Sequence, residues 1–106
     1  MESQQTLQKL AEILEQRKSA KADESYVASL YEGGLEKILD KINEESTEVI
    51  DAAREENAEH LTHEVADLWF HCMVLLAEKG LSYEDVLAEL NKRFGISGFV
   101  EKAQRK

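Results

Sequence analysis

Five acidic residues at helical spacing are the part of this sequence best suited to chemistry. Glu44, Glu45 and Glu48 lie in the segment EESTE, and Glu64 and Asp67 lie in the segment EVAD. Residues three to four apart share one side of an α-helix. Carboxylates that gather in a partly dry space repel one another, whereas a hard divalent cation such as Mg²⁺ binds them together with substrate phosphates. The pattern therefore raises the hypothesis of a Mg²⁺ site.

These acids also lie where a helix would bury them. Glu45 falls three residues after Ile42, inside the apolar stripe of its segment. Glu64 and Asp67 stand just before the apolar run LWFHCMVLLA. Only the short segment EENAE separates the two regions, which favours an antiparallel helical hairpin. In such a hairpin the two rows of acids face each other.

A second interpretation needs no metal. Glu-rich helices usually present a solvated face on which acids pair with bases one turn away. Lys37, Lys41 and Arg54 are available as such partners. This interpretation suits Glu44 best. It suits Glu45 poorly, because Glu45 lies within the apolar stripe, and it suits Glu64 and Asp67 least, because they stand beside the apolar run.

Two other metal patterns are less well matched. HEVAD, from His63 to Asp67, is similar to the H-E-x-x-H zinc helix, but Asp replaces the last His, and the helical wheel places His63 away from Glu64. A di-iron bundle needs Glu-x-x-His pairs, which are absent around these acids. His71, one turn after Asp67, is interpreted either as a group near the site or as a histidine at the edge of the core.

Hydrophobic periodicity predicts four main helices, over residues 3–18, 35–56, 58–79 and 82–95, and no strand. A short helical turn is expected before the second helix, with Ser25 as its N-cap and Gly33-Gly34 as its end. Ser82 and Asp85 resemble a capping box. Trp69 and Phe70 are expected in the core or in a subunit interface. The predicted core side chains are Leu7, Leu10, Ala11 and Leu14; Leu35, Ile38, Leu39, Ile42, Val49, Ile50 and Ala53; Leu61, Val65, Ala66, Leu68, Phe70, Cys72, Met73 and Leu76; and Val86, Leu87, Leu90 and Phe94.

Composition narrows the class of protein. The 106 residues suit a single domain, 1–106, with 42% hydrophobic residues for its core. A net charge of −9 disfavours binding to nucleic acid or to anionic membranes. One cysteine, Cys72, allows no disulfide within the chain, and no apolar run is long enough to span a bilayer. We therefore expect a cytoplasmic protein with no membrane segment.

Four segments together resemble a known family. They are SYVASL, GLEKILDKINEESTEVIDAA, HEVADLWFHCMVLL and ELNKRFGISGFVEKAQR. The acid pattern EExxE…ExxD resembles that of the MazG-type all-α nucleotide pyrophosphohydrolases. Within that superfamily, SY-x-A-x-L and the tail R-x-G-x-SG-x-x-EK-x-x-R are similar to the phosphoribosyl-ATP pyrophosphohydrolases of histidine biosynthesis.

The resemblance implies a fold, a reaction and a site. The fold is an all-α antiparallel bundle of about four to five helices that forms a homodimer. The reaction is Mg²⁺-dependent hydrolysis of phosphoribosyl-ATP to phosphoribosyl-AMP and pyrophosphate. The residues expected to bind metal and take part in catalysis are Glu44, Glu45, Glu48, Glu64 and Asp67. The residues expected to contact the substrate are Lys37, Lys41, His71, Arg93, Ser97, Lys102 and Arg105.

Two other functions remain open from the sequence. One is a housecleaning pyrophosphohydrolase that acts on other nucleoside triphosphates with the same acids. The other is a helical dimerisation module with no catalytic activity. Competition between substrates separates the first from the phosphoribosyl-ATP enzyme, and a complete lack of turnover identifies the second.

Overall fold

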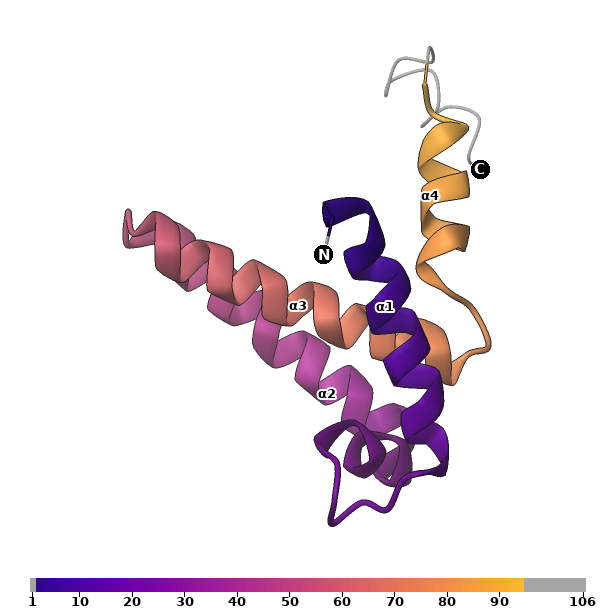
Figure 1. Cartoon of the computed structure of the whole chain (residues 1–106). Coiled ribbons are helices and arrows are strands. Elements are labelled where there is room, and N and C mark those ends of the chain that lie inside the picture. Colours follow the sequence, from indigo (N-terminus) through magenta and orange to yellow (C-terminus); the bar gives the residue numbers. More distant parts are fainter. Residues whose placement is uncertain (1, 95–106) are drawn as a thin grey trace, which may run out of the picture.

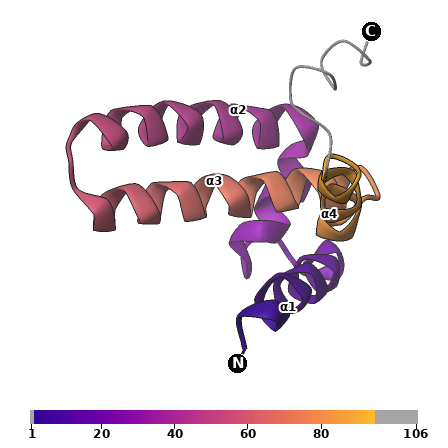
Figure 2. The same cartoon turned by 90° about the horizontal axis from the view of Figure 1, so that it is seen from above.

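The structure is a computed structural model that describes residues 2–94. Its helices are α1 (Ser3–Gln16), the 3₁₀ turn η1 (Arg17–Ser19), α2 (Tyr26–Arg54), α3 (Ala58–Glu78) and α4 (Tyr83–Asn91), and no strand occurs among these residues. Helices α2 and α3 lie side by side as an antiparallel hairpin, with α1 across one end and α4 beside it (Figures 1 and 2). The all-α class predicted from the sequence is confirmed.

Helix α2 is two helical segments joined at Gly34. This residue has φ +83° and ψ −174°, outside the helical region, and Figure 2 shows the start of α2 turned away from its straight remainder. The predicted break at Gly33-Gly34 is thus confirmed. Ser25 is the predicted N-cap, and its side chain accepts a hydrogen bond from the backbone of Ala28 at 3.2 Å. The straight segment carries the acids, while the first segment carries Tyr26.

Substitution of Gly34 should therefore destabilise the fold through the backbone alone. A Cβ at this position would meet no atom within 4 Å, but φ +83° is strained for any L side chain. We expect Gly34→Ala to lower the free energy of unfolding by about 1–3 kcal/mol, measured by urea denaturation. The control is Gly33→Ala, whose new Cβ would displace the side chain of Lys37 but would not occupy a backbone position with positive φ. Equal losses in both variants would contradict the role given to Gly34.

The core lies where α1, α2 and α3 meet. Leu14, Leu30, Ile38 and Val74 are its largest fully buried side chains. The hydroxyl of Tyr31 donates to the backbone carbonyl of Leu14 at 3.0 Å and so joins the start of α2 to the end of α1. This core fixes the end of the α2–α3 hairpin that is farther from the turn between the two helices.

Several side chains predicted in the core are exposed, so that part of the prediction is wrong. They are Leu39, Ile50 and Ala53 on α2, Ala66 on α3, and Val86, Leu87, Leu90 and Phe94 on and after α4. Helical periodicity identifies an apolar side but not what covers it. The apolar side of α4, including Leu87, instead lines an open groove of about 340 Å³ together with Trp69 of α3. Trp69 itself is 62% exposed.

The ends of the later helices follow local sequence signals. Ser82 and Asp85 form the predicted capping box at the start of α4. Gly80, with φ +75°, follows the end of α3 and allows the chain to turn. Between residues 2 and 94, no helix combines the length and apolarity that a bilayer crossing needs.

Candidate metal centre

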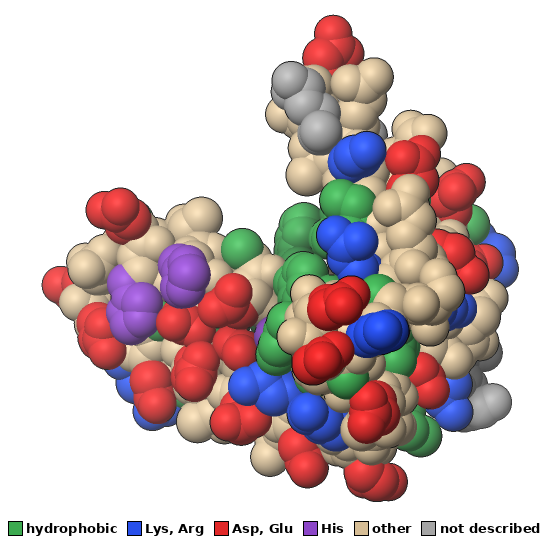
Figure 3. All heavy atoms as spheres, turned by 60° about the horizontal axis from the view of Figure 1, so that its bottom comes forward, with side chains coloured by type: hydrophobic (Ala, Val, Ile, Leu, Met, Phe, Trp, Pro, Cys, Tyr) green, Lys and Arg blue, Asp and Glu red, His purple; other side chains and the backbone are tan. Residues whose placement is uncertain are grey.

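The hairpin brings the two rows of acids together. One carboxylate oxygen from each of Glu45, Glu48 and Glu64 lies within 4.8 Å of the others. Helix α3 begins directly after its N-cap, Asn57, whose side chain accepts from the backbone of His60 at 3.0 Å. The turn is therefore short, and the helices run antiparallel with their acids facing. Figure 3 shows acidic side chains and histidines gathered on the arm that α2 and α3 form.

Two of these carboxylates are buried, and one oxygen of each has no hydrogen-bond partner. Glu45 is 6% exposed and Glu64 is 9% exposed, and the Oε2 atom of each has no hydrogen-bond partner. Burial, together with repulsion from Glu48 and the other acids, raises the pKa of Glu45 to about 7. A buried, unpartnered carboxylate oxygen is costly, and a bound cation satisfies it. The donor set, which is oxygen only, suits a hard divalent cation.

The pKa of Glu64 is raised as well, first because its protonated carboxyl can hydrogen-bond Glu48, and then by burial and by repulsion from Glu48 and Asp67. His60 opposes this rise. Its Nε2 lies 3.3 Å from Oε1 of Glu64, and its Nδ1 lies 2.8 Å from Oε2 of Glu55. The hydrogen bond to Glu55 raises the pKa of His60. His60 thus links Glu64 to the turn between the helices.

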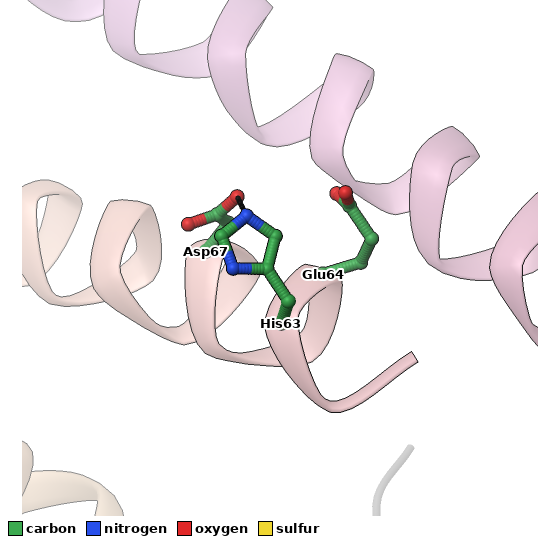
Figure 4. Close-up of side chains that lie close together, drawn as sticks. All are labelled: His63, Glu64 and Asp67. Atoms are coloured by element: carbon green, nitrogen blue, oxygen red, sulfur yellow. Dashed lines mark ion pairs between the residues drawn. The ribbon is translucent and has the colours of Figure 1, made fainter. Parts of the chain in front are cut away.

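Asp67 belongs to a second group, with His63 and again Glu64, whose ligand atoms lie within 4.8 Å of one another. Nε2 of His63 lies 3.4 Å from Oδ2 of Asp67 (Figure 4). Figure 4 also shows the Glu64 carboxylate turned toward α2. The helical wheel placed His63 away from Glu64, and this prediction was incomplete. The spacing of four residues between His63 and Asp67 brings the imidazole to the edge of the group that includes Glu64.

The other predicted site residues are placed differently. Glu44 lies in neither group and pairs with Lys41 at 3.5 Å, as the interpretation without a metal expects. Nζ of Lys37 lies 3.5 Å from the carbonyl of Ser29. Arg93 pairs with Glu89 at 3.5 Å on α4. Ser97, Lys102 and Arg105 lie outside the residues that the structure describes.

His71 is buried at the edge of the first acid group. Its Nδ1 lies 2.8 Å from the backbone carbonyl of Asp67, and its Nε2 lies 2.8 Å from the hydroxyl of Tyr26. Sequence reasoning gave His60 and Tyr26 no role at the site. The four-residue spacing from Glu64 was a signal for His60, whereas the position of Tyr26 depends on the break at Gly34.

The described residues form an all-α protein in which buried carboxylate oxygens without hydrogen-bond partners lie between two antiparallel helices, and such oxygen donors suit a divalent cation. The chain belongs to the phosphoribosyl-ATP pyrophosphohydrolase family, whose family model matches residues 7–94. It is 58% identical over 100 residues to a protein of Methylococcus capsulatus, covering 94% of this chain and 95% of that relative. It is 51% identical over 107 residues to one of Hydrogenovibrio crunogenus, covering 97% and 95%. Both relatives are named phosphoribosyl-ATP pyrophosphatase, and the family predicted from the sequence is confirmed.

Proposed function

We propose that this chain, as a single all-α domain, hydrolyses phosphoribosyl-ATP between its α and β phosphates in a Mg²⁺-dependent step of histidine biosynthesis. The products are phosphoribosyl-AMP and pyrophosphate. Family membership and the names of the relatives support the substrate. The observation that carries the chemistry is the pair of buried, unpartnered carboxylate oxygens on Glu45 and Glu64.

In this proposal Glu45, Glu48, Glu64 and Asp67 hold the cation, with Glu44 at their edge. Bound Mg²⁺ supplies positive charge to the triphosphate and lowers the pKa of a water molecule. A carboxylate of the group that is not fully engaged accepts the proton of the attacking water. The proposed contacts to the substrate are Lys37, Lys41, His71, Arg93, Ser97, Lys102 and Arg105.

The test is release of pyrophosphate from phosphoribosyl-ATP, with Mg²⁺ and with excess EDTA. We expect turnover only with Mg²⁺. Competition with ATP and with non-canonical nucleoside triphosphates then defines the substrate. Preference for those competitors would favour a housecleaning enzyme, and no turnover on any nucleotide would favour a non-catalytic module.

A cytoplasmic location is also part of this proposal. The single cysteine, Cys72, forms no disulfide within the chain, which accords with a reducing compartment. The net charge of −9 disfavours nucleic acid as a partner. We therefore expect the ligand to be a small nucleotide bound through a cation, and not a nucleic acid.

We further propose that the chain forms a homodimer through the groove between α3 and α4. Exposed apolar side chains there, including Trp69, Leu87 and Leu90, support this proposal, since such a patch commonly marks an interface. Leu87→Glu should place a charge in the interface. We expect the dissociation constant to rise at least about 30-fold, equivalent to about 2 kcal/mol, measured by analytical ultracentrifugation.

The matched control for this variant is Ala88→Glu, which adds the same charge to an exposed position of α4 that does not line the groove. It should leave the dimer unchanged. A wild-type chain that stays monomeric at high micromolar concentration, or a dimer that both variants weaken equally, would contradict the assignment of this groove.

A further inference from the structure

We propose that Tyr26 is a positioning residue for the metal centre. Its hydroxyl holds the His71 ring in the orientation that keeps the imidazole from pairing with Glu45, so the Glu45 carboxylate stays available to a divalent cation. This inference deepens the proposed function, because it rests on the acids between α2 and α3 binding such a cation.

The His71 ring is fixed at both nitrogens. A backbone carbonyl only accepts, so Nδ1 carries a hydrogen and donates it to Asp67 at 2.8 Å. Nε2 lies 2.8 Å from the hydroxyl of Tyr26, a group that can donate or accept. Phe70 lies edge-on to the ring, with centroids 5.3 Å apart and planes 82° apart, and stacks on Tyr26 at 6.5 Å. The hydroxyl of Tyr26 is therefore the contact that fixes the Nε2 side of the ring.

In this orientation His71 does not satisfy Glu45. Nδ1 lies 4.0 Å from Oε1 of Glu45, which is too long for a hydrogen bond, and Oε2 has no partner at all. A charged carboxylate is a stronger acceptor than a neutral carbonyl. A His71 ring that was free to turn would therefore leave the Asp67 carbonyl and donate to Glu45. That contact would draw electron density from the carboxylate and so weaken its attraction for the cation.

The experiment uses Mn²⁺ as the probe, because it accepts the same oxygen ligands and its free form is counted by electron paramagnetic resonance. Binding of Mn²⁺ alone, without substrate, is measured for the wild-type protein, for Tyr26→Phe, for His71→Leu and for the double variant. We expect Tyr26→Phe to weaken Mn²⁺ binding by about 10–100-fold. In the His71→Leu background the same change should shift affinity by less than about twofold, because the ring that would turn to Glu45 is gone.

The matched control is Tyr31→Phe, which removes a tyrosine hydroxyl that donates to the Leu14 carbonyl, away from the acids. It should leave Mn²⁺ affinity unchanged. Equal affinity of Tyr26→Phe and the wild type, equal weakening in both backgrounds, or no binding by the wild type would overturn the inference. Tyr26 is 52% exposed, so this variant should fold.

A second readout separates positioning from simple loss of structure. If Tyr26 acts through cation affinity, turnover of Tyr26→Phe should recover as Mg²⁺ is raised, with the same kcat at saturation. A kcat that stays low at saturating Mg²⁺ would overturn the inference. Failure to hydrolyse phosphoribosyl-ATP, with the expected Mn²⁺ pattern intact, would instead reject the proposed function alone.

Discussion

Glu64→Gln should lower the turnover of phosphoribosyl-ATP by at least about 100-fold while preserving the fold. Glu64 is shared by both groups of acids, and its Oε2 is buried without a partner. Glutamine keeps the shape of the side chain but removes the charge that a cation needs. Initial rates of pyrophosphate release at saturating Mg²⁺ measure the effect, and circular dichroism checks that the helices remain.

The control for this variant is Glu59→Gln, the same exchange at an exposed position of α3. It should retain activity within about twofold, the range usual for an exposed charge outside the site. Full activity of Glu64→Gln would reject the role of the facing acids. Equal losses in both variants would point to the net charge of α3 instead of the metal centre.

Glu45→Gln should have opposite effects on stability and on function. The raised pKa of Glu45, about 7 against an ordinary 4.5, means that its ionised form is unfavourable in the metal-free fold. We expect the substitution to stabilise the metal-free protein by on the order of 3 kcal/mol at pH 8 and to abolish activity. Chemical denaturation in EDTA measures the first effect, and pyrophosphate release measures the second.

The pH dependence has a definite sign. Because its pKa is higher folded than unfolded, Glu45 binds more protons in the folded chain between about pH 4.5 and 7. The metal-free protein should therefore lose stability as the pH rises through that interval, and Glu45→Gln should reduce the slope. Glu36→Gln, an exposed exchange on α2, is the control. An unchanged slope for Glu45→Gln would contradict the burial and repulsion assigned to this carboxylate.

Local signals in the sequence predicted most of the fold. The caps at Ser25 and Ser82 and the break before Leu35 depend on a few neighbouring residues, so they could be read directly. The burial of Glu45 followed from the helical period, which placed it in an apolar stripe. The short turn between the helices allowed us to predict that the two rows of acids face each other.

Features that depend on distant contacts could not be predicted. The contact of Tyr26 with His71 joins residues 45 positions apart and depends on the direction of the chain at Gly34. The exposure of Leu87 and Leu90 depends on what lies against α4, which periodicity does not report. The roles of the acids in metal binding stay predictions, although their positions are now known.

Two different sides of helix α3 contribute to the acid groups and to the apolar groove. Glu64, Asp67 and His71 line its side toward α2, while Trp69 and Leu76 line the groove. A rotation or axial shift of α3 would displace both surfaces together. Under the proposed dimer, a neighbouring subunit in the groove would therefore contact the same helix that carries the carboxylates, and we expect changes in assembly to alter the geometry of the acids.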